Sequence, residues 1–491
     1  MYKKIIIVML IVLGAFTTFF LYRTYAYDTS VVEETPTTTD KAYTFKIGNS
    51  SIKQIKLETG ETKYFDIVLS NPNNAKISYS IYYEMVSPTT KPDGFSIGYT
   101  SKSTGTSTGK VDKNGNITLS IEASNTSSSA VTVKIGTVAG YVNGGELTLG
   151  SGQVIIPKAL GNATSKIEKL NDNGSGDSGS GVYKVTHSAI PASSSATGSE
   201  IPAVTDYRYY GPSPNNYICL DMEGGSTCPD KHLYRIIGSI YEEKENTNRI
   251  KVIKATPLTD GTTKGFSWDY TSSGSNSNIW ATITNGNYSN SLTSGSQLMK
   301  LLNSGLWWNG TSGSYYNNST TATNVNFTNY KLSDKAKSYI TTSRYYLGGY
   351  NASSGVMTNQ FYTYERGTTR YDTNRPLYWD GMVGLMYPSD YGYAAGNTCV
   401  TGTDPYNYDG GCKNKDWLWM TTSSDYSNNA EWLMSPRSDL SDYAFGVFSS
   451  GYVNNNSFVN GVNSARPVFY LNSRASISEG EGTLDAPYIL S

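Results

Sequence analysis

The sequence is short of the side chains that carry most enzyme chemistry. Its 491 residues include only two histidines, His187 and His232, and charged residues make up 16% of the chain. His187 falls in a polar spacer, and His232 begins an expected strand, where we predict that it simply packs. No His-Glu-x-x-His motif occurs, which excludes a zinc protease of that kind. We therefore predict no catalytic residues and a protein that is not an enzyme.

Cysteine is scarce as well, with four residues that form two close pairs. Cys219 lies nine positions before Cys228, and Cys399 lies thirteen positions before Cys412. In an exported chain such pairs predict two local disulfides, while four free thiols are the alternative. No Cys-x-x-Cys motif occurs, and the two histidines are not at metal-ligand spacing, so no zinc site is predicted.

The chain has no excess of charge of either sign. Its 39 lysines and arginines balance 40 aspartates and glutamates, for a formal net charge of −1. Nucleic acids and anionic surfaces recruit proteins with a basic excess, so we predict no nucleic-acid partner.

One apolar run is long enough to matter for a membrane. Two lysines precede the apolar stretch from Ile5 to Tyr22, which is 18 residues long. This pattern is typical of an export signal, yet the run is just long enough to span a bilayer. Either a peptidase cuts after Ala26, or residues 1–27 remain as a signal-anchor helix. Both readings place the rest of the chain outside the cell membrane, either anchored to it or secreted.

The next segments predict a stalk and a first domain. Residues 28–41 are rich in Thr and Glu and show no apolar pattern. From 42 to 159, short runs alternate apolar and polar residues and are separated by Asn-, Gly- and Pro-rich turns. The alternating apolar positions include Phe65, Ile67 and Leu69, then Ile117, Leu119 and Ile121. Short strands of this kind predict an Ig-like β-sandwich.

The segment 160–205 is predicted to be a flexible linker. It contains the stretch NDNGSGDSGSG, which has no side chains to bury, and continues with Ala, Ser and Pro. Asp172 and Asp177 in this stretch are expected to be solvated rather than to bind calcium, because no bidentate carboxylate follows at loop spacing.

Residues 206–491 are predicted to form a second domain of mixed type. Leu233–Gly238 and Ile250–Ile253 are expected to be strands, and Ser294–Leu302 has leucines at helical spacing. A second helix is expected after Ser333, which is a suitable N-cap. The chain as a whole is therefore predicted to be mainly β, with a C-terminal α+β part.

Several motifs of this second domain resemble those of a known family. They are Tyr207–Gly211, Tyr234–Gly238, Gly384–Gly392, Glu431–Pro436 and Ala465–Leu471. Together they resemble uncharacterised surface proteins of gut Firmicutes that carry a DUF6273-like domain. The stretch from Trp432 to Leu471 also resembles the C-terminal half of C-type-lectin-like folds, with a Gly turn at 449–451 and an Asn- and Ser-rich loop at 454–464. The resemblance implies a C-type-lectin-like domain.

The predicted ligand contacts lie in this hairpin and loop. Trp432 and Arg466 are expected to be structural, with Arg466 holding the last strand, since it precedes a proline. The loop shows no clear alternation, so its side chains are free to contact a ligand; the candidates are Tyr452, Asn454, Asn455, Asn456, Phe458 and Asn460. A solvated turn without a partner is the alternative, and Trp307-Trp308 is the second candidate region.

Other candidate sites have less support from the sequence. Carboxylates for glycosidase chemistry are present at Glu365, Asp380 and Asp390, but they are scattered. The Asp404–Gly410 loop offers Asp404, Asn407 and Asp409 to calcium, without the strict alternation that calcium loops show. We therefore predict no cofactor.

Binding is the function that the composition favours. Tyr, Ser, Gly and Asn dominate adaptable binding loops, and aromatic faces stack on sugars. We predict a non-catalytic surface adhesin that binds a glycan or protein outside the cell. A structural envelope or extracellular-matrix component is the first alternative, and an exported glycan-active enzyme is the second.

Overall fold

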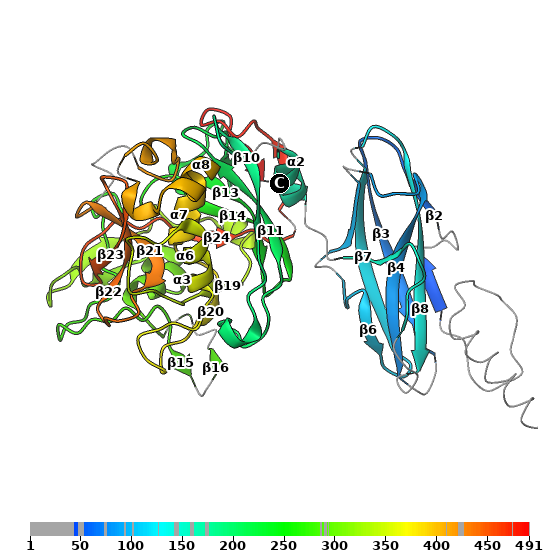
Figure 1. Ribbon diagram of the computed structural model, residues 1–491, viewed down its shortest axis with the longest axis horizontal. Helices are drawn as coiled ribbons and strands as arrows, with labels where there is room; N and C mark the ends of the chain where they lie inside the picture. Colours follow the sequence, from blue (N-terminus) through cyan, green and yellow to red (C-terminus); the bar gives the residue numbers. More distant parts are fainter. Residues whose placement is uncertain are drawn as a thin grey trace, which may run out of the picture. The chain divides into compact units, whose positions relative to one another are not determined.

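A computed structural model describes much of the chain as two compact units, Met1–Ala159 and Leu160–Ser491 (Figure 1). The described residues are 44–47, 54–72, 76–92, 95–100, 103–125, 127–141, 147–157, 162–171, 176–284, 287–288, 292, 294–408, 410–420, 427–473 and 475–490. The predicted signal or anchor (1–27) and the stalk (28–41) lie outside them. Within the described ranges, no helix has the length and apolar character to cross a membrane.

The first unit contains two antiparallel sheets. One has the strand order β1 (Thr44–Ile47), β3 (Glu61–Ser70), β7 (Asn116–Asn125) and β5 (Phe95–Tyr99). The other has the order β2 (Gln54–Leu57), β8 (Val131–Tyr141), β4 (Ile77–Ser87) and β6 (Thr108–Val111), with β9 (Gln153–Ile155) also paired to β4.

The apolar alternation in the sequence explains this arrangement. In the β3–β7 pair, Ile67 lies opposite Leu119, and Leu69 lies opposite Ile117. Their side chains join those of Val131 and Val133 from the other sheet in one buried core. The predicted β-sandwich is therefore confirmed, whereas its Ig-like assignment stays a prediction.

The second unit is built on an eight-stranded sheet. Its strands β10 (Gly181–His187), β11 (Val204–Tyr210), β13 (Leu233–Glu242), β14 (Thr247–Lys254) and β24 (Val468–Tyr470) follow one another. β12 (Tyr217–Cys219) also pairs with β13, on the same edge as β11. β26 (Tyr488–Leu490) pairs with the other edge of β12, and β25 (Ile477–Glu479) pairs with β26. β13 and β14 are the two strands expected from the sequence.

The predicted linker at 160–205 is wrong over most of its length. The helix α2 (Asn162–Lys169) buries Ala163 and Ile167 in the core of the second unit. The strand β10 pairs with β11 along seven residue pairs. The many Ala, Ser and Gly residues concealed a strand and a short amphipathic helix, and the second unit begins at Leu160 rather than at residue 206.

Both expected helices are present. α3 (Gln297–Asn303) is capped by Ser296, whose side chain accepts from the backbone N–H of Met299, and α5 (Asp334–Ser338) is capped by Ser333. The other helices are α4 (Leu306–Asn309), α6 (Thr358–Glu365), α7 (Pro388–Ala394) and α8 (Asn397–Gly402), with 3₁₀ turns η1 (Ala192–Ser194), η2 (Asp230–His232), η3 (Pro405–Asn407) and η4 (Lys413–Lys415).

Small sheets complete the second unit. Three are two-stranded antiparallel sheets: β15 (Ile283–Thr284) with β16 (Asn287–Tyr288), β17 (Ser312–Tyr315) with β18 (Thr323–Asn326), and β19 (Ser343–Tyr346) with β20 (Tyr378–Gly381). The fourth is a three-stranded sheet of β21 (Ala430–Pro436), β22 (Tyr443–Phe448) and β23 (Val453–Phe458). α7 contacts both β11 and β21, so it lies between the large sheet and this three-stranded sheet (Figure 1).

Candidate functional site

The three-stranded sheet β21–β22–β23 is held from within by a buried tryptophan. Trp432 on β21 is fully buried, and its indole Nε1–H donates to the carbonyl of Phe266 at 2.7 Å. Val447 and Val453, which face each other across β22 and β23, are also fully buried. This placement fits the structural role expected of Trp432.

A buried ion pair joins the same sheet to the segment before β24. The Arg466 guanidinium donates to both carboxylate oxygens of Glu431, at 2.6 and 2.9 Å, and to the carbonyl of Leu418 at 2.7 Å. Both side chains are at most 2% exposed. Burial raises the pKa of Glu431, and Arg466 opposes this effect. The geometry fits the structural role expected of Arg466.

The segment predicted as an irregular Asn-rich loop is in part a strand. β23 alternates, with Val453, Asn455 and Ser457 buried and Asn454, Asn456 and Phe458 facing outward. The alternation was invisible in the sequence because two inward positions are polar. Asn455 is only 5% exposed and donates to the carbonyl of Asn351 at 2.9 Å, so it does not belong to an outer surface.

Asn460, the last of the six candidates, follows the strand. Its side chain is half-buried, and its carbonyl accepts a hydrogen bond of 2.7 Å from the Ser267 hydroxyl. The structure thus leaves Tyr452, Asn454, Asn456 and Phe458 as neighbours on one outer face.

Aromatic rings occupy both ends of this outer face. At one end Tyr452 stacks on Phe448, with centroids 5.1 Å apart, and meets Tyr406 of η3 edge-on at 5.8 Å. At the other end Phe458, which is 51% exposed, packs against Tyr443 at 4.1 Å. We call this surface the aromatic face; it consists of Tyr406, Tyr443, Phe448, Tyr452, Asn454, Asn456 and Phe458. It combines ring faces for stacking with amides that both donate and accept.

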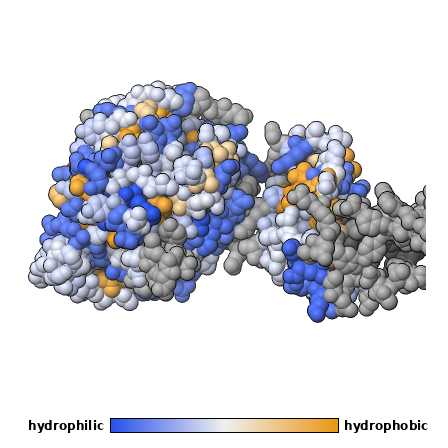
Figure 2. Space-filling model, turned by 60° about the horizontal axis from the view of Figure 1, so that its bottom comes forward, coloured by the Kyte–Doolittle hydropathy of each residue, from blue (hydrophilic) through white to orange (hydrophobic). Residues whose placement is uncertain are grey.

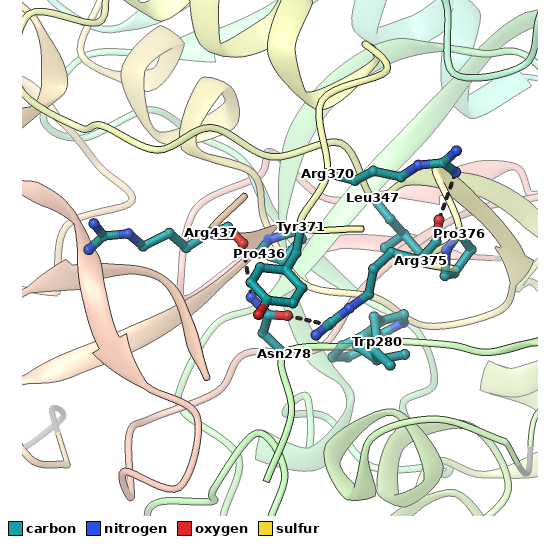
Figure 3. Close-up of a pocket in the computed structure, with 10 residues that line it drawn as sticks. Asn278, Trp280, Leu347, Arg370, Tyr371, Arg375, Pro376, Pro436 and Arg437 are labelled. Atoms are coloured by element: carbon teal, nitrogen blue, oxygen red, sulfur yellow. Dashed lines mark hydrogen bonds between the residues drawn. The ribbon is translucent and has the colours of Figure 1, made fainter. Parts of the chain in front are cut away.

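Arg437 connects the aromatic face to a pocket. Its guanidinium donates to the Asn456 side chain, chelates Asp439 at 2.6 and 3.1 Å, and lies 5.6 Å from the ring centroid of Tyr443. In the pocket view this guanidinium points away from the other lining side chains (Figure 3). Arg437 therefore contacts the aromatic face through its head group and lines the pocket through its backbone.

The pocket, which we call the Arg375 pocket, is lined by residues from distant parts of the sequence (Figure 3): Asn278, Ile279, Trp280, Leu347, Arg370, Tyr371, Arg375, Pro376, Pro436 and Arg437. The Arg375 guanidinium donates to the side-chain oxygen of Asn278. The Asn278 amide in turn donates to the carbonyls of Arg437, Leu440 and Tyr443, at 2.7 to 3.0 Å. No sequence pattern could have signalled this pocket, because only the tertiary fold assembles it.

Two of the scattered carboxylates, Glu365 and Asp390, lie in one buried network. Asp390 pairs with Arg208 at 3.0 Å and with Lys251 at 2.5 Å. Burial disfavours the charged form of Asp390, yet Lys251 and Arg208 outweigh burial, so its pKa is lowered. Glu365 accepts from the backbone and hydroxyl of Ser389, and burial raises the pKa of Glu365 to about 7.

Neither of these two carboxylates faces solvent, since Glu365 and Asp390 are each 2% exposed. The third, Asp380, is chelated by Arg344 at 2.9 and 3.1 Å. The structure therefore uses all three in ion pairs and hydrogen bonds within the fold.

Both histidines are buried and bound to carboxylates. His187 lies in β10, not in a spacer; its Nε2 is 2.9 Å from Asp206, and its ring stacks on Tyr362 at 3.6 Å. Burial lowers the pKa of His187, and Asp206 opposes this effect. His232 is fully buried, as its predicted packing role requires, with Nε2 3.1 Å from Glu223.

His232 also lies close to two carboxylates, which its sequence spacing did not reveal. Ligand atoms of Asp221, Glu223 and His232 lie within 4.8 Å of one another. However, Glu223 pairs with Lys231 at 2.8 Å, and Asp221 accepts from the Ser333 hydroxyl at 2.6 Å. Lys231 and the Ser333 hydroxyl thus already bind carboxylate oxygens of this cluster.

A literal Gly-x-Ser-x-Gly match occurs at Gly105–Gly109 in the first unit. Ser107 is only 2% exposed, and the match runs into β6 rather than joining a strand to a helix. Both histidines belong to the second unit. The match therefore lacks the strand-to-helix setting of a nucleophile elbow.

The loop that offered a weak calcium candidate is arranged differently from a cation site. Asp404 accepts from the backbone N–H of Asn407 at 3.1 Å and from that of Gly355 at 3.1 Å. The Asn407 amide donates to Asp404 as well, at 2.9 and 3.1 Å, so it turns its N–H groups and not its oxygen toward the carboxylate. Asp409 lies outside the described residues. Asp404 acts as the cap of η3.

Both predicted disulfides are confirmed. Cys219 is bonded to Cys228 and Cys399 to Cys412, each with a Cα–Cα distance of 5.8 Å. These distances lie within the range of unstrained bridges. The second disulfide joins α8 to the segment just before η4.

Comparisons with known proteins add little. No protein-family model and no curated protein matches the chain. Among solved structures, the ASH / PapD-like domain of human CEP192 (PapD-like domain 7) is similar at 16% sequence identity and a TM-score of 0.13, covering 24% of this chain and 99% of that chain. A likeness with so low a TM-score carries no argument about function.

Proposed function

We propose that this chain is an exported, non-catalytic ligand-binding protein of the cell surface, held by its N-terminal segment or secreted. In this proposal the β-sandwich is a spacer, and the second unit binds a glycan or a protein as an adhesin. We also propose that the second unit is a DUF6273-like, C-type-lectin-like domain. The three-stranded sheet, followed by Arg466 and a strand that joins the large sheet, supports this assignment.

The observation that carries the proposal is the aromatic face. Monomeric proteins tolerate single exposed aromatic residues, but here several rings gather with outward amides on one small sheet. The frame beneath them is rigid, because Trp432 and Arg466 are buried and hydrogen-bonded. Aromatic and amide side chains fixed on a rigid frame match the needs of sugar or peptide recognition.

The character of the surface supports a polar ligand. On the face of the second unit that Figure 2 shows, apolar residues form separate spots on a largely hydrophilic surface. A polar chain such as a glycan suits a surface of this kind better than a broad apolar interface does. The two disulfides also agree with an oxidising location outside the cytoplasm.

The test is a glycan array and a pull-down with the full chain, compared with the triple variant Tyr452→Ala, Asn454→Ala, Phe458→Ala. We expect specific, saturable binding by the parent chain and none by the triple variant, with unchanged thermal unfolding. Tyr64→Ala is the matched control, since it removes a ring that is 68% exposed on the first unit. Self-association without any saturable ligand supports the structural-component alternative instead.

Normal binding by the triple variant contradicts the assignment of the site. Trp307-Trp308, the second candidate region from the sequence, is a poor alternative binding site. Trp307 is 1% exposed and thus buried, and Lys337 lies 5.0 Å over the ring of Trp308.

A further inference from the structure

The charge of Arg375 is balanced differently from the charges of Arg344 and Arg466. Arg344 and Arg466 each donate to both oxygens of one carboxylate. Arg375 instead donates to a neutral amide, and the carboxylate contact found for it among the described residues, to Asp372, is 3.6 Å long. Asp372 itself is 41% exposed, so water weakens that pair further.

The position of Arg375 makes this imbalance significant. Its side chain is 11% exposed, and burial lowers the pKa of Arg375, with Asp372 opposing the effect. A largely buried cation gains little from a partner that is itself exposed to water, and a bound carboxylate adds paired hydrogen bonds to it. The guanidinium is also held in place, because Asn278 is fixed by three backbone carbonyls.

A second arginine adds to the positive charge of the pocket. Arg370 also lines the pocket, and it donates to the carbonyl of Arg375 at 2.8 Å. Over the described ranges, no salt bridge of Arg370 to a carboxylate is found. Arg437 also lines the pocket, but its guanidinium points away and pairs with Asp439, so Arg370 and Arg375 carry the charge of the pocket. The lining contains no acidic residue.

The remaining walls of the pocket are apolar, and an aromatic ring stands at its edge. Trp280, Leu347, Pro376 and Pro436 line the pocket, and the ring of Tyr371 stands beside Arg375 and is 45% exposed (Figure 3). An aromatic ring next to a guanidinium offers stacking to a sugar and ion pairing to its carboxylate. The pocket also continues into the aromatic face through Pro436 and Arg437.

We propose that the Arg375 pocket binds the carboxylate of an acidic sugar, of the uronic or sialic acid class, on a glycan that extends over the aromatic face. This inference rests on the proposed function and names the class of its ligand. Arg375 forms the ion pair, Arg370 contributes charge, and Tyr371 stacks on the ring.

The test uses the full chain and pairs of glycans that differ only in the acid. The probes are 3′-sialyllactose against its methyl ester, and trigalacturonate against its methyl ester. We expect the parent chain to prefer each acidic member by roughly 10- to 100-fold, since hydrogen bonds to charged groups contribute about 1.5–3 kcal/mol. Arg375→Gln and Arg370→Gln should each reduce this preference and leave binding of the neutral member unchanged.

Two further variants sharpen the result. Arg375→Lys keeps the charge but loses the planar fork, so we expect an intermediate preference. Lys244→Gln removes an exposed cation elsewhere and should leave all four affinities unchanged. Thermal unfolding of every variant verifies that the fold is intact.

The outcomes separate this inference from the proposed function. Equal binding of acidic and neutral members, unaffected at Arg375 and Arg370, overturns the acidic-sugar inference and leaves ligand binding in place. Binding of a peptide C-terminal carboxylate in preference to every acidic sugar also overturns it. The absence of any saturable ligand for the parent chain contradicts the proposed function itself.

Discussion

Removing Arg466 should strongly destabilise the second unit. Arg466→Ala leaves the Glu431 carboxylate buried without its two hydrogen bonds and removes a donor from the Leu418 carbonyl. Loss of one partner of a buried ion pair costs about 3–5 kcal/mol. An unfolding entropy of about 2.1 cal/mol/K per residue gives about 0.7 kcal/mol/K for a unit of roughly 330 residues. The expected drop in Tm is therefore about 4–7 °C.

The assay can follow the second unit alone. All eight tryptophans of the chain lie between Trp268 and Trp432, so tryptophan fluorescence does not report on the β-sandwich. Lys335→Ala is the control, because Lys335 is 53% exposed and 3.9 Å from Asp221. An exposed pair contributes at most about 1 kcal/mol, so the control should shift Tm by less than about 2 °C.

The loss should also depend on pH. Without Arg466, the pKa of the buried Glu431 rises further above its unfolded value, so the folded variant holds a proton that the unfolded chain releases. Stability of the variant then falls as pH rises above the unfolded pKa of about 4.3, and the gap to the parent chain widens from pH 5 to pH 8. An unchanged Tm together with lost ligand binding refutes this reasoning and makes Arg466 a ligand contact.

Two further predictions concern the buried network and the boundary of the second unit. Burial raises the pKa of Glu365 to about 7, so the folded chain binds an extra proton and stability falls as pH rises from about 4.5 to about 7. Between pH 5 and pH 7, the free energy of unfolding in urea titrations should change less for Glu365→Gln than for the parent chain. An equal change in both contradicts the raised pKa of Glu365. Fragment 206–491 lacks α2 and β10, so its Tm in a fluorescence scan should be about 5 °C or more below that of fragment 160–491. Equal Tm values would support the prediction that residues 160–205 are a flexible linker.

The sequence predicted best where one physical signal dominates. In the first unit, alternating residues such as Ile67 and Leu69 face a single core, so the period of two was enough to predict the strands. The disulfides followed from close spacing of cysteines, and the caps of α3 and α5 followed from serines. Each of these features depends on residues that are near in the sequence or regular in pattern.

The sequence failed where polar or small residues are buried by tertiary contacts. Asn455 and Ser457 occupy the inward positions of β23, and a hydrogen bond to Asn351 satisfies the former, so the strand looked like a loop. β10 was hidden among Gly and Ser, although Val182 and Tyr183 are buried. The Arg375 pocket joins residues nearly 160 positions apart, which no local pattern reports.

The same inward polar positions explain how the candidate site keeps its shape. An amide on a free loop loses conformational entropy when it binds, which weakens binding by about 0.5–1.5 kcal/mol per immobilised side chain. On β23 the backbone is already paired with β22, and the buried Asn455 is bonded to Asn351, so Asn454 and Asn456 project from a fixed frame. Arg437 further restrains Asn456 by hydrogen bonding to its amide oxygen. The buried polar groups of β23 thus hold the strand in place, and its outward amides lose less conformational entropy on binding than the same amides would on the loop expected from the sequence.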